Sequence, residues 1–301
     1  MILDPKTIQP IRGYLSNIRK DLGERAGVPK LSINTLPALN RKIWGLKEGL
    51  TVIGGRTSQG KSALALQIAF DLAGQSIPVL FLSLEMTVEA LIERLFCNIE
   101  EVDNYSILTG RFKNDLEIQA KWKTFTDYAS KIPLLITCGI GKNFQEINKL
   151  VPMINPEPKV VIVDYVQAIV TKAGQSREMI NEYIRYFRQL AIEKKFAGVL
   201  CSQINRGAEE TRRNEPHLYQ LKETGVLEEH ADTVLLLHWP NFYTRDPSKV
   251  NEFKINIAKQ RNGRTGEHNL IWKPEYYKFT EKVIHVDESG IGSIVDRSSL
   301  R

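Results

Sequence analysis

Segments with strand character alternate along the chain with longer segments of helical character. The segments expected to be strands are residues 50–53, 78–84, 134–137, 160–163 and 197–203. The segments expected to be helices are residues 63–74, 88–99, 113–130, 143–151 and 176–195. Strands that are apolar on both faces are typical of a buried parallel sheet, and their alternation with helices is typical of α/β folds. The pattern predicts an α/β fold with a central, mainly parallel sheet flanked by helices.

The pattern changes toward the C-terminal end of the chain. Residues 231–238 are expected to form one more apolar strand, and residues 252–260 alternate between apolar and polar positions. The tail around Trp272 and Phe279 resembles short antiparallel strands. At the other end, residues 30–49 carry turn signals and are expected to be an irregular lead-in to the first strand.

A separate amphipathic segment precedes the main domain. Residues 11–25 place their apolar side chains on one helical stripe, which a folded protein has to bury. Such a helix packs either on its own core or on a neighbouring subunit, and the pattern leaves both open. We divide the chain into a linker helix or arm at residues 1–28 and a main domain at residues 29–301.

The most specific pattern lies in residues 50–62, LTVIGGRTSQGKS. It fits G-x-x-x-x-G-K-[ST], the phosphate-binding loop between a strand and a helix. Glycines let consecutive N–H groups curl around a phosphate, and the helix adds its positive N-terminal end. Lys61 suits the β- and γ-phosphates of a nucleoside triphosphate, and the Ser62 hydroxyl suits Mg²⁺. The expected phosphate-binding residues are Gly55, Arg56, Thr57, Ser58, Gln59, Gly60, Lys61 and Ser62.

Polar residues end three of the other predicted strands. Asp164 follows four apolar residues and is expected to support Mg²⁺ beside Ser62; a capping aspartate is the alternative. Glu85 is a candidate general base for the attacking water, or else a solvated side chain. Gln203 is a candidate sensor of the γ-phosphate, or simply a polar residue at a strand exit. Ligands gather at the carboxyl ends of parallel strands, so these positions are expected to lie together.

Three polar segments are candidates for anionic ligands. Residues 204–216 contain Arg206 and Arg212, and residues 221–225 read LKETG, a predicted polar loop. Residues 259–266 read KQRNGRTG, a turn that presents Lys259, Arg261 and Arg264. Exposed basic loops are most often only solvated. In a nucleotide-hydrolysing enzyme, however, an arginine often neutralises transition-state charge, in cis or from a partner, and Lys259 with Arg261 is the best candidate pair.

Composition and charge add little that is specific. The chain has 301 residues, of which 42% are hydrophobic, and a formal charge of +6. A basic balance suits a polyanionic partner but identifies none. The three cysteines, Cys97, Cys138 and Cys201, are far apart, and we expect buried thiols in a reducing compartment. No signal core and no apolar run of membrane length is present, so a soluble cytoplasmic protein is expected.

Together these motifs resemble the C-terminal ATPase domain of the DnaB-type replicative helicases. The resemblance runs over residues 50–279 and rests on GGRTSQGKSALALQIA, VLFLSLEM, VVIVDYVQ, CSQINR, LKETGVLEEHADTVLLLH and AKQRNGRTG, in that order. It implies a RecA-like fold that forms a ring of six subunits around single-stranded DNA. ATP and Mg²⁺ would lie between subunits, and the ring would move 5′ to 3′. Primase and a helicase loader are partners in that family.

The resemblance also implies a role for each matching residue. Lys61 and Ser62 would bind phosphate and Mg²⁺, Glu85 would be the catalytic base, and Asp164 would support the metal. Gln203 would couple the nucleotide state to DNA, and Lys259 and Arg261 would reach into the site of the adjacent subunit. The residues expected to contact DNA are Lys222, Glu223, Gly225, Arg206 and Arg212.

The chain departs from the family in two places. Only about 30 residues precede the motor, where the family usually has an N-terminal helical domain before the linker helix. Lys222 stands where the family commonly has arginine. A truncated chain and a naturally short, phage-encoded protein both fit these departures. The alternative functions are a RadA-like recombinase that coats DNA and a nucleotide-gated loading factor.

Overall fold

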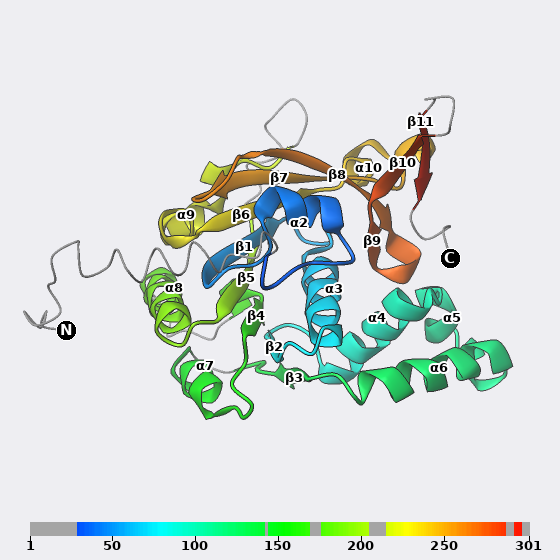
Figure 1. Ribbon diagram of the computed structural model, residues 1–301, viewed down its shortest axis with the longest axis horizontal. Coiled ribbons are helices and arrows are strands. Elements are labelled where there is room, and N and C mark those ends of the chain that lie inside the picture. Colours follow the sequence, from blue (N-terminus) through cyan, green and yellow to red (C-terminus); the bar gives the residue numbers. More distant parts are fainter. Residues whose placement is uncertain (1–28, 142–143, 169–175, 205–214, 287–291, 297–301) are drawn as a thin grey trace, which may run out of the picture.

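The central feature of the computed structural model is a nine-stranded sheet in the order β3-β2-β4-β5-β1-β6-β7-β8-β9 (Figure 1). The structure describes residues 29–141, 144–168, 176–204, 215–286 and 292–296. The strands are β1 (Gly49–Gly55), β2 (Val79–Ser83), β3 (Leu134–Cys138), β4 (Val160–Asp164), β5 (Ala197–Gln203), β6 (Thr233–His238), β7 (Glu252–Gln260), β8 (Gly266–Lys273), β9 (Lys278–Thr280), β10 (Lys282–Val286) and β11 (Gly292–Asp296).

Strand direction divides the sheet into two parts. The six strands β1 to β6 are mutually parallel, and β7, β8 and β9 continue the sheet as antiparallel strands. The two strands β10 and β11 form a separate antiparallel pair. The sequence therefore predicted correctly both the parallel core and the change to antiparallel pairing near the C-terminal end.

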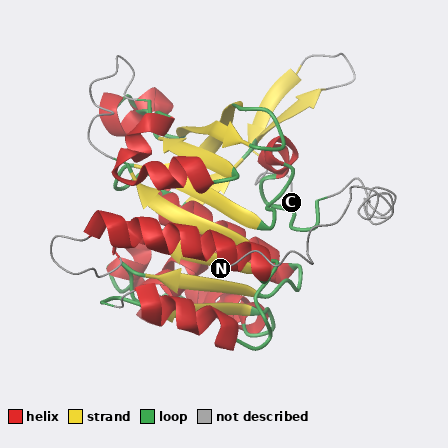
Figure 2. Ribbon diagram, turned by 90° about the vertical axis from the view of Figure 1, so that its left-hand side faces the viewer, coloured by secondary structure: helices red, strands yellow, loops and turns green. Residues whose placement is uncertain are grey.

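Helices cover both faces of the sheet (Figure 2). The α-helices are α2 (Pro37–Ile43), α3 (Lys61–Gly74), α4 (Val88–Glu100), α5 (Asn104–Leu108), α6 (Leu116–Ala129), α7 (Phe144–Leu150), α8 (Ser176–Glu193), α9 (Gly225–His230) and α10 (Asn241–Thr244). Short 3-10 helices include η6 (Leu218–Thr224) and η8 (Pro274–Tyr276). Helices α2, α3, α4 and α6 share one hydrophobic core with the sheet, and α7, α8 and α9 share the other.

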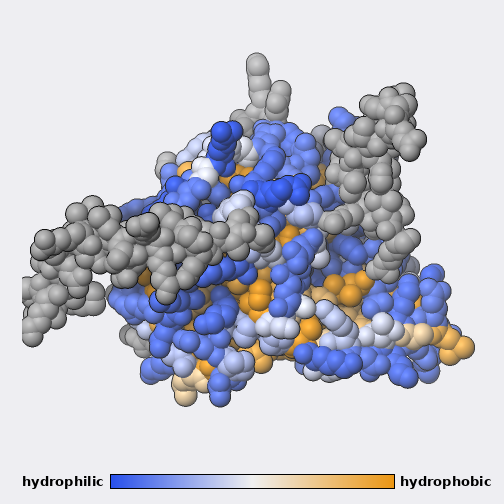
Figure 3. Space-filling model, viewed as in Figure 1, coloured by the Kyte–Doolittle hydropathy of each residue, from blue (hydrophilic) through white to orange (hydrophobic). Residues whose placement is uncertain are grey.

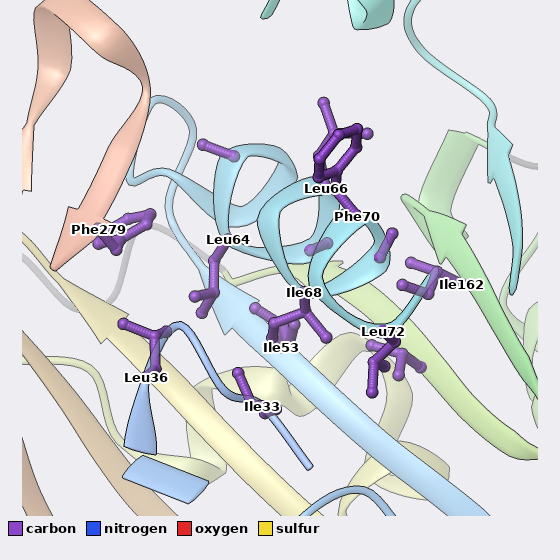
Figure 4. Close-up of a cluster of buried hydrophobic side chains, with 14 of the residues drawn as sticks. Ile33, Leu36, Ile53, Leu64, Leu66, Ile68, Phe70, Leu72, Ile162 and Phe279 are labelled. Atoms are coloured by element: carbon purple, nitrogen blue, oxygen red, sulfur yellow. The ribbon is translucent and has the colours of Figure 1, made fainter. Parts of the chain in front are cut away.

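Alternate residues of each parallel strand supply the two cores. In β1, Val52 faces the α8 side while Ile53 faces the α3 side, and Val161 and Ile162 divide in the same way in β4. This is the two-residue period of a strand that is buried on both faces. Figure 4 shows the α3 side, where Leu64, Ile68 and Leu72 lie among strand residues.

The surface in the view of Figure 1 is mostly hydrophilic, and hydrophobic atoms appear among the helices of its lower half (Figure 3). Two of the exposed apolar residues are Leu108 of α5 and Leu116 of α6. Within the described residues, no helix is both long enough and apolar enough to span a membrane.

Most predicted elements are present with small changes at their ends, but three expectations were wrong. Residues 30–49 are not irregular throughout, because Pro37 opens α2 and Leu39 and Ile43 are buried. Residues 221–225 are not a loop, since they end η6 and begin α9. Cys138 is exposed rather than buried, because β3 is the outermost strand of the sheet. The expected helix at residues 11–25 lies outside the described residues.

Candidate active site

The phosphate-binding motif lies between β1 and α3 at the carboxyl edge of the parallel strands (Figure 1). Its backbone has positive φ at Ser58 and Gly60, 63° and 74°. A Cβ at Gly60 would lie 2.7 Å from the ring of Phe279, so only glycine fits there without movement. The loop is thus held between its own strand and helix on one side and strand β9 on the other.

Lys61 points back into the loop. It is only 9% exposed, and its Nζ donates a hydrogen bond to the Arg56 carbonyl oxygen at 2.9 Å. Burial lowers the pKa of Lys61, whereas Cys201, Asp164 and Glu85 raise it. Negative charge beside the loop therefore favours the protonated form of Lys61, and a bound phosphate would supply such charge.

Gln59 was predicted from the sequence only as one of the phosphate-binding residues, but in the structure it also connects the loop to the segment after β6. Its side chain is 1% exposed, and its Oε1 accepts a hydrogen bond from the Trp239 N–H at 2.6 Å, just after β6. Its Nε2 is buried without a hydrogen-bond partner among the described residues. The motif leaves this position unspecified, so its spacing carried no signal for the contact.

Asp164 ends β4 and is fully buried, in register with Ser83 of β2. Burial raises the pKa of Asp164, and the Ser62 hydroxyl, the Cys201 thiol and Lys61 oppose that rise. Neither carboxylate oxygen has a well-formed hydrogen bond from the described residues. A buried carboxylate in this condition is costly unless a cation joins it. Asp164 and Ser62 offer the hard oxygen ligands that suit Mg²⁺.

Glu85 and Gln203 lie at the same edge and are both exposed. Glu85 follows β2, and it lies near enough to Lys61 to raise the pKa of that ammonium group. Gln203 ends β5 in register with Gly55 of β1. The structure therefore brings Lys61, Ser62, Glu85, Asp164 and Gln203 to one edge, as the rule for parallel strands predicts.

Gln167 joins the ends of β4 and β5 and was noticed only as part of a family motif. Its Nε2 donates to the Ser202 Oγ at 2.7 Å and to the Gln203 carbonyl oxygen at 3.1 Å. Its Oε1 accepts from the Gln203 N–H at 3.0 Å. The backbone of Gln203 is thereby fixed to the strand that carries Asp164.

Lys259 and Arg261 lie at the opposite edge of the sheet. Because β7 runs antiparallel, its last residue, Gln260, pairs with Thr233 at the start of β6. The intervening strand β1 has seven residues, about 20 Å at the usual rise per residue. Within one chain, the cations and the phosphate loop are therefore not brought together.

Main-chain carbonyls of α9 hold both cations. Lys259 Nζ donates to the carbonyl oxygens of Glu228 and Glu229 at 2.6 and 3.1 Å, and Arg261 Nη2 donates to that of Glu229 at 3.0 Å. Burial lowers the pKa of Lys259, and the neighbouring Arg261 lowers it further. The C-terminal end of a helix attracts cations in this way.

The expected DNA-binding residues are mostly untested. Arg206 and Arg212 lie outside the described residues. Lys222 and Glu223 belong to η6 by their backbone, and Gly225 is exposed at the first position of α9. Their proposed roles stay predictions.

The sheet order and the loop define a phosphate-loop α/β domain with a RecA-like fold. The chain belongs to the family described as "DnaB-like helicase C terminal domain", whose profile matches residues 33–281. It is 27% identical over 277 residues to the replicative DNA helicase DnaC of Bacillus subtilis, which covers 89% of this chain and 60% of that protein. It is 30% identical over 268 residues to the replicative DNA helicase DnaB of Leifsonia xyli, covering 86% of this chain and 57% of that protein.

Solved structures support the same fold. One of them, an isolated ATPase domain, superposes with a TM-score of 0.84 at 24% identity, covering 91% of this chain and 99% of that one. A DnaB-like replicative helicase, solved in a study of its interactions with primase, gives a TM-score of 0.81 at 24% identity and covers 91% of this chain and 67% of that one. The chain thus spans about 60% of the length of the curated relatives it matches.

Proposed function

We propose that this chain is the ATP-hydrolysing motor of a replicative DNA helicase, which moves 5′ to 3′ on single-stranded DNA as a ring of six subunits. The observation that carries the proposal is the separation of two half-sites. The phosphate loop lies at one edge of the sheet, and Lys259 and Arg261 lie at the other. A complete site then requires two chains. Such a motor works in the bacterial cytoplasm, or in that of the host of a phage.

At the phosphate-loop edge, the chain binds ATP and positions water. Backbone N–H groups of residues 56–62 and the Lys61 ammonium bind the phosphates. Ser62 and Asp164 hold Mg²⁺, which neutralises phosphate charge when bound. Glu85, exposed beside the loop, orients the attacking water and accepts its proton. Gln203, whose backbone is fixed by Gln167, contacts the γ-phosphate. It transmits the presence of that phosphate to the segment of the same polypeptide that follows β5.

At the cation edge, Lys259 and Arg261 complete the site of the next chain. The Arg261 side chain is 42% exposed even though it is hydrogen-bonded. It can therefore contact phosphate oxygens without unfolding any element. A guanidinium there stabilises charge that develops as the γ-phosphoryl group leaves.

The DNA strand would contact the segment from Lys222 to Gly225, together with Arg206 and Arg212. Helix α9 begins at Gly225, the last residue of this segment. Contacts to the DNA backbone predict affinity that falls steeply with salt. Primase and a loader are further partners that we propose from the family, and primase appears with one structural neighbour.

The test is ATP turnover, with and without single-stranded DNA, measured over a range of protein concentrations alongside the mass of the particles. We expect turnover per chain to rise steeply as monomers assemble into hexamers, and 5′-tailed duplexes to be unwound. Full turnover by monomers would refute the shared site. Absence of turnover with DNA in assembled hexamers would refute the motor itself. Open filaments with strand exchange would favour the recombinase-like alternative.

A further inference from the structure

Asp232, immediately before β6, joins three elements at the cation edge. Its backbone N–H donates to the Leu50 carbonyl oxygen at 2.7 Å, and its own carbonyl accepts from the Arg261 N–H at 2.9 Å. Its carboxylate Oδ2 accepts from the Leu50 N–H at 2.9 Å. Three of its polar groups are therefore committed to fixing its place between β1 and the residue that follows β7.

The backbone of Gly49 lies so close to the Asp232 carboxylate that residue 49 has to be glycine. Gly49 has φ of +117°, and a Cβ there would collide with Asp232 Oδ2. Any side chain at residue 49 would therefore displace the carboxylate. The start of β1 is shaped to admit Asp232, and β1 is the strand that leads into the phosphate loop.

The remaining oxygen of Asp232 is shared by two guanidinium groups. Arg261 Nη1 lies 3.3 Å from Oδ1, and Arg188 Nη2 of α8 lies 3.4 Å from the same atom. The Arg188 and Asp232 side chains are each 23% exposed, whereas Arg261 is 42% exposed. One carboxylate thus serves two cations, and the more exposed of them is Arg261.

We propose that Asp232 is a positioning residue for Arg261, and that Arg188 tunes its hold. This rests on the proposed function, in which Arg261 enters the site of a neighbouring chain. Asp232 and the Glu229 carbonyl fix two sides of the guanidinium, so its exposed side is presented without a search among rotamers. Because Arg188 shares the Asp232 carboxylate with Arg261, the cluster of three side chains has a net positive charge and can still attract a phosphate.

The experiment is a double-mutant cycle on assembled, DNA-stimulated full-length chains. Asp232→Asn keeps the size of the side chain but removes its charge. It also replaces one carboxylate oxygen by an NH₂ group, which would face N–H donors of Leu50 or of the two arginines. We expect it to lower kcat about 10- to 100-fold, with KM for ATP nearly unchanged. In an Arg261→Ala background we expect Asp232→Asn to have almost no further effect, because Asp232 acts through Arg261.

Other outcomes overturn the inference. An equal loss in both backgrounds would mean that Asp232 acts independently of Arg261, and a rise in KM with kcat unchanged would mean that it affects ATP binding. If Arg261→Ala itself leaves turnover unchanged, the shared site fails and this inference fails with it. If Arg261→Ala abolishes turnover but Asp232→Asn has no effect, only this inference fails. Thermal melting monitors the fold of each variant.

A second variant covers the case in which Asp232→Asn does not fold. Arg188→Gln is expected to lower kcat several-fold in the wild-type background, because the Asp232 carboxylate then pairs with Arg261 alone and offsets more of its charge. In the Arg261→Ala background it should have no such effect. Arg185→Gln, an exposed change one turn earlier on α8, is the matched control and should leave kcat unchanged. An effect of Arg188→Gln that persists without Arg261 would contradict the inference.

Discussion

The two edges of the sheet carry charge in opposite ways. At the carboxyl edge, Asp164 is 0% exposed and Lys61 9% exposed, and the loop that holds Lys61 is fixed by Gln59. At the other edge, Arg261 is 42% exposed and its partners are two carbonyls and a shared carboxylate oxygen. The first edge buries the charges of Asp164 and Lys61, and the second leaves the charge of Arg261 partly exposed to solvent.

The difference has an energetic basis. A buried carboxylate such as Asp164, whose oxygens have no well-formed hydrogen bond from the described residues, costs free energy that a bound cation recovers. An exposed guanidinium costs little in the isolated chain, and its attraction to phosphate is strong only where water is excluded. The two edges should therefore respond differently to mutation, and four changes test this, from the largest expected effect to the smallest.

Arg261→Ala should lower kcat roughly 10³- to 10⁵-fold, the usual range for loss of an arginine finger. Nucleotide affinity should change little, because the phosphate loop belongs to the other chain. Turnover and the binding of a fluorescent ATP analogue measure the two effects. Arg264→Ala, an exposed change in the same turn, is the control. Equal losses of kcat in the two variants would show that turnover depends only on the total positive charge of the turn and not on Arg261 in particular.

Glu85→Gln should lower kcat about 10²- to 10⁴-fold, because the amide keeps the shape but accepts no proton. ATP should still bind and accumulate in the site, as single-turnover measurements would reveal. Glu89→Gln, an exposed change in the first turn of α4, is the matched control. Unchanged turnover in Glu85→Gln would remove this residue as the base.

Lys61→Ala should lower kcat roughly 10²- to 10³-fold, as expected for one electrostatic contact to a developing charge. Unlike Arg261→Ala, it should also weaken nucleotide binding, because Lys61 belongs to the loop that holds the phosphates. Equilibrium titration with the same analogue measures that difference. Unaltered affinity would mean that Lys61 remains on the Arg56 carbonyl when nucleotide binds.

The smallest expected effect is that of Asp164→Asn, which should stabilise the fold. It should raise the free energy of unfolding of the nucleotide-free chain, by about 1 kcal/mol or more, because it removes a buried charge whose oxygens have no well-formed hydrogen bond from the described residues. The folded-state pKa of Asp164 is raised by burial. Wild-type stability should therefore fall as pH rises from about 3.9, the unfolded value, through the folded pKa.

The variant should lack this fall, and denaturant titrations at several pH values measure it. The affinity for Mg²⁺ should fall at the same time. A less stable Asp164→Asn chain would mean that the carboxylate is already paired in the folded protein.

Local patterns predicted the carboxyl edge well. The motif at residues 55–62 is contiguous, and Glu85, Asp164 and Gln203 each end an apolar run, so the parallel-strand rule brought them together correctly. The contacts of Asp232 were not predictable in this way. Leu50 lies 182 positions earlier in the chain. The pattern of apolar and polar residues does not show which distant segment will contact the start of β1.

The same reason explains other misses. Helix α2 begins where the Ala38 and Leu39 N–H groups donate to Glu281, more than 240 residues away. Its seven residues are too few for an apolar pattern to be distinctive. Cys138 follows the apolar strand pattern, but its exposure depends on β3 being at the end of the sheet, which is a property of strand order.

The antiparallel direction of β7 has a consequence for the symmetry of assembly. It gives each chain one edge with a phosphate loop and an opposite edge with cations. In the ring of six proposed above, the phosphate-loop edge of one chain meets the cation edge of the next, so the chains associate head to tail. Such an interface is heterologous and has a direction. It closes into a ring only if the rotation between successive chains divides a full turn, and a small change in that angle opens the ring into a helix.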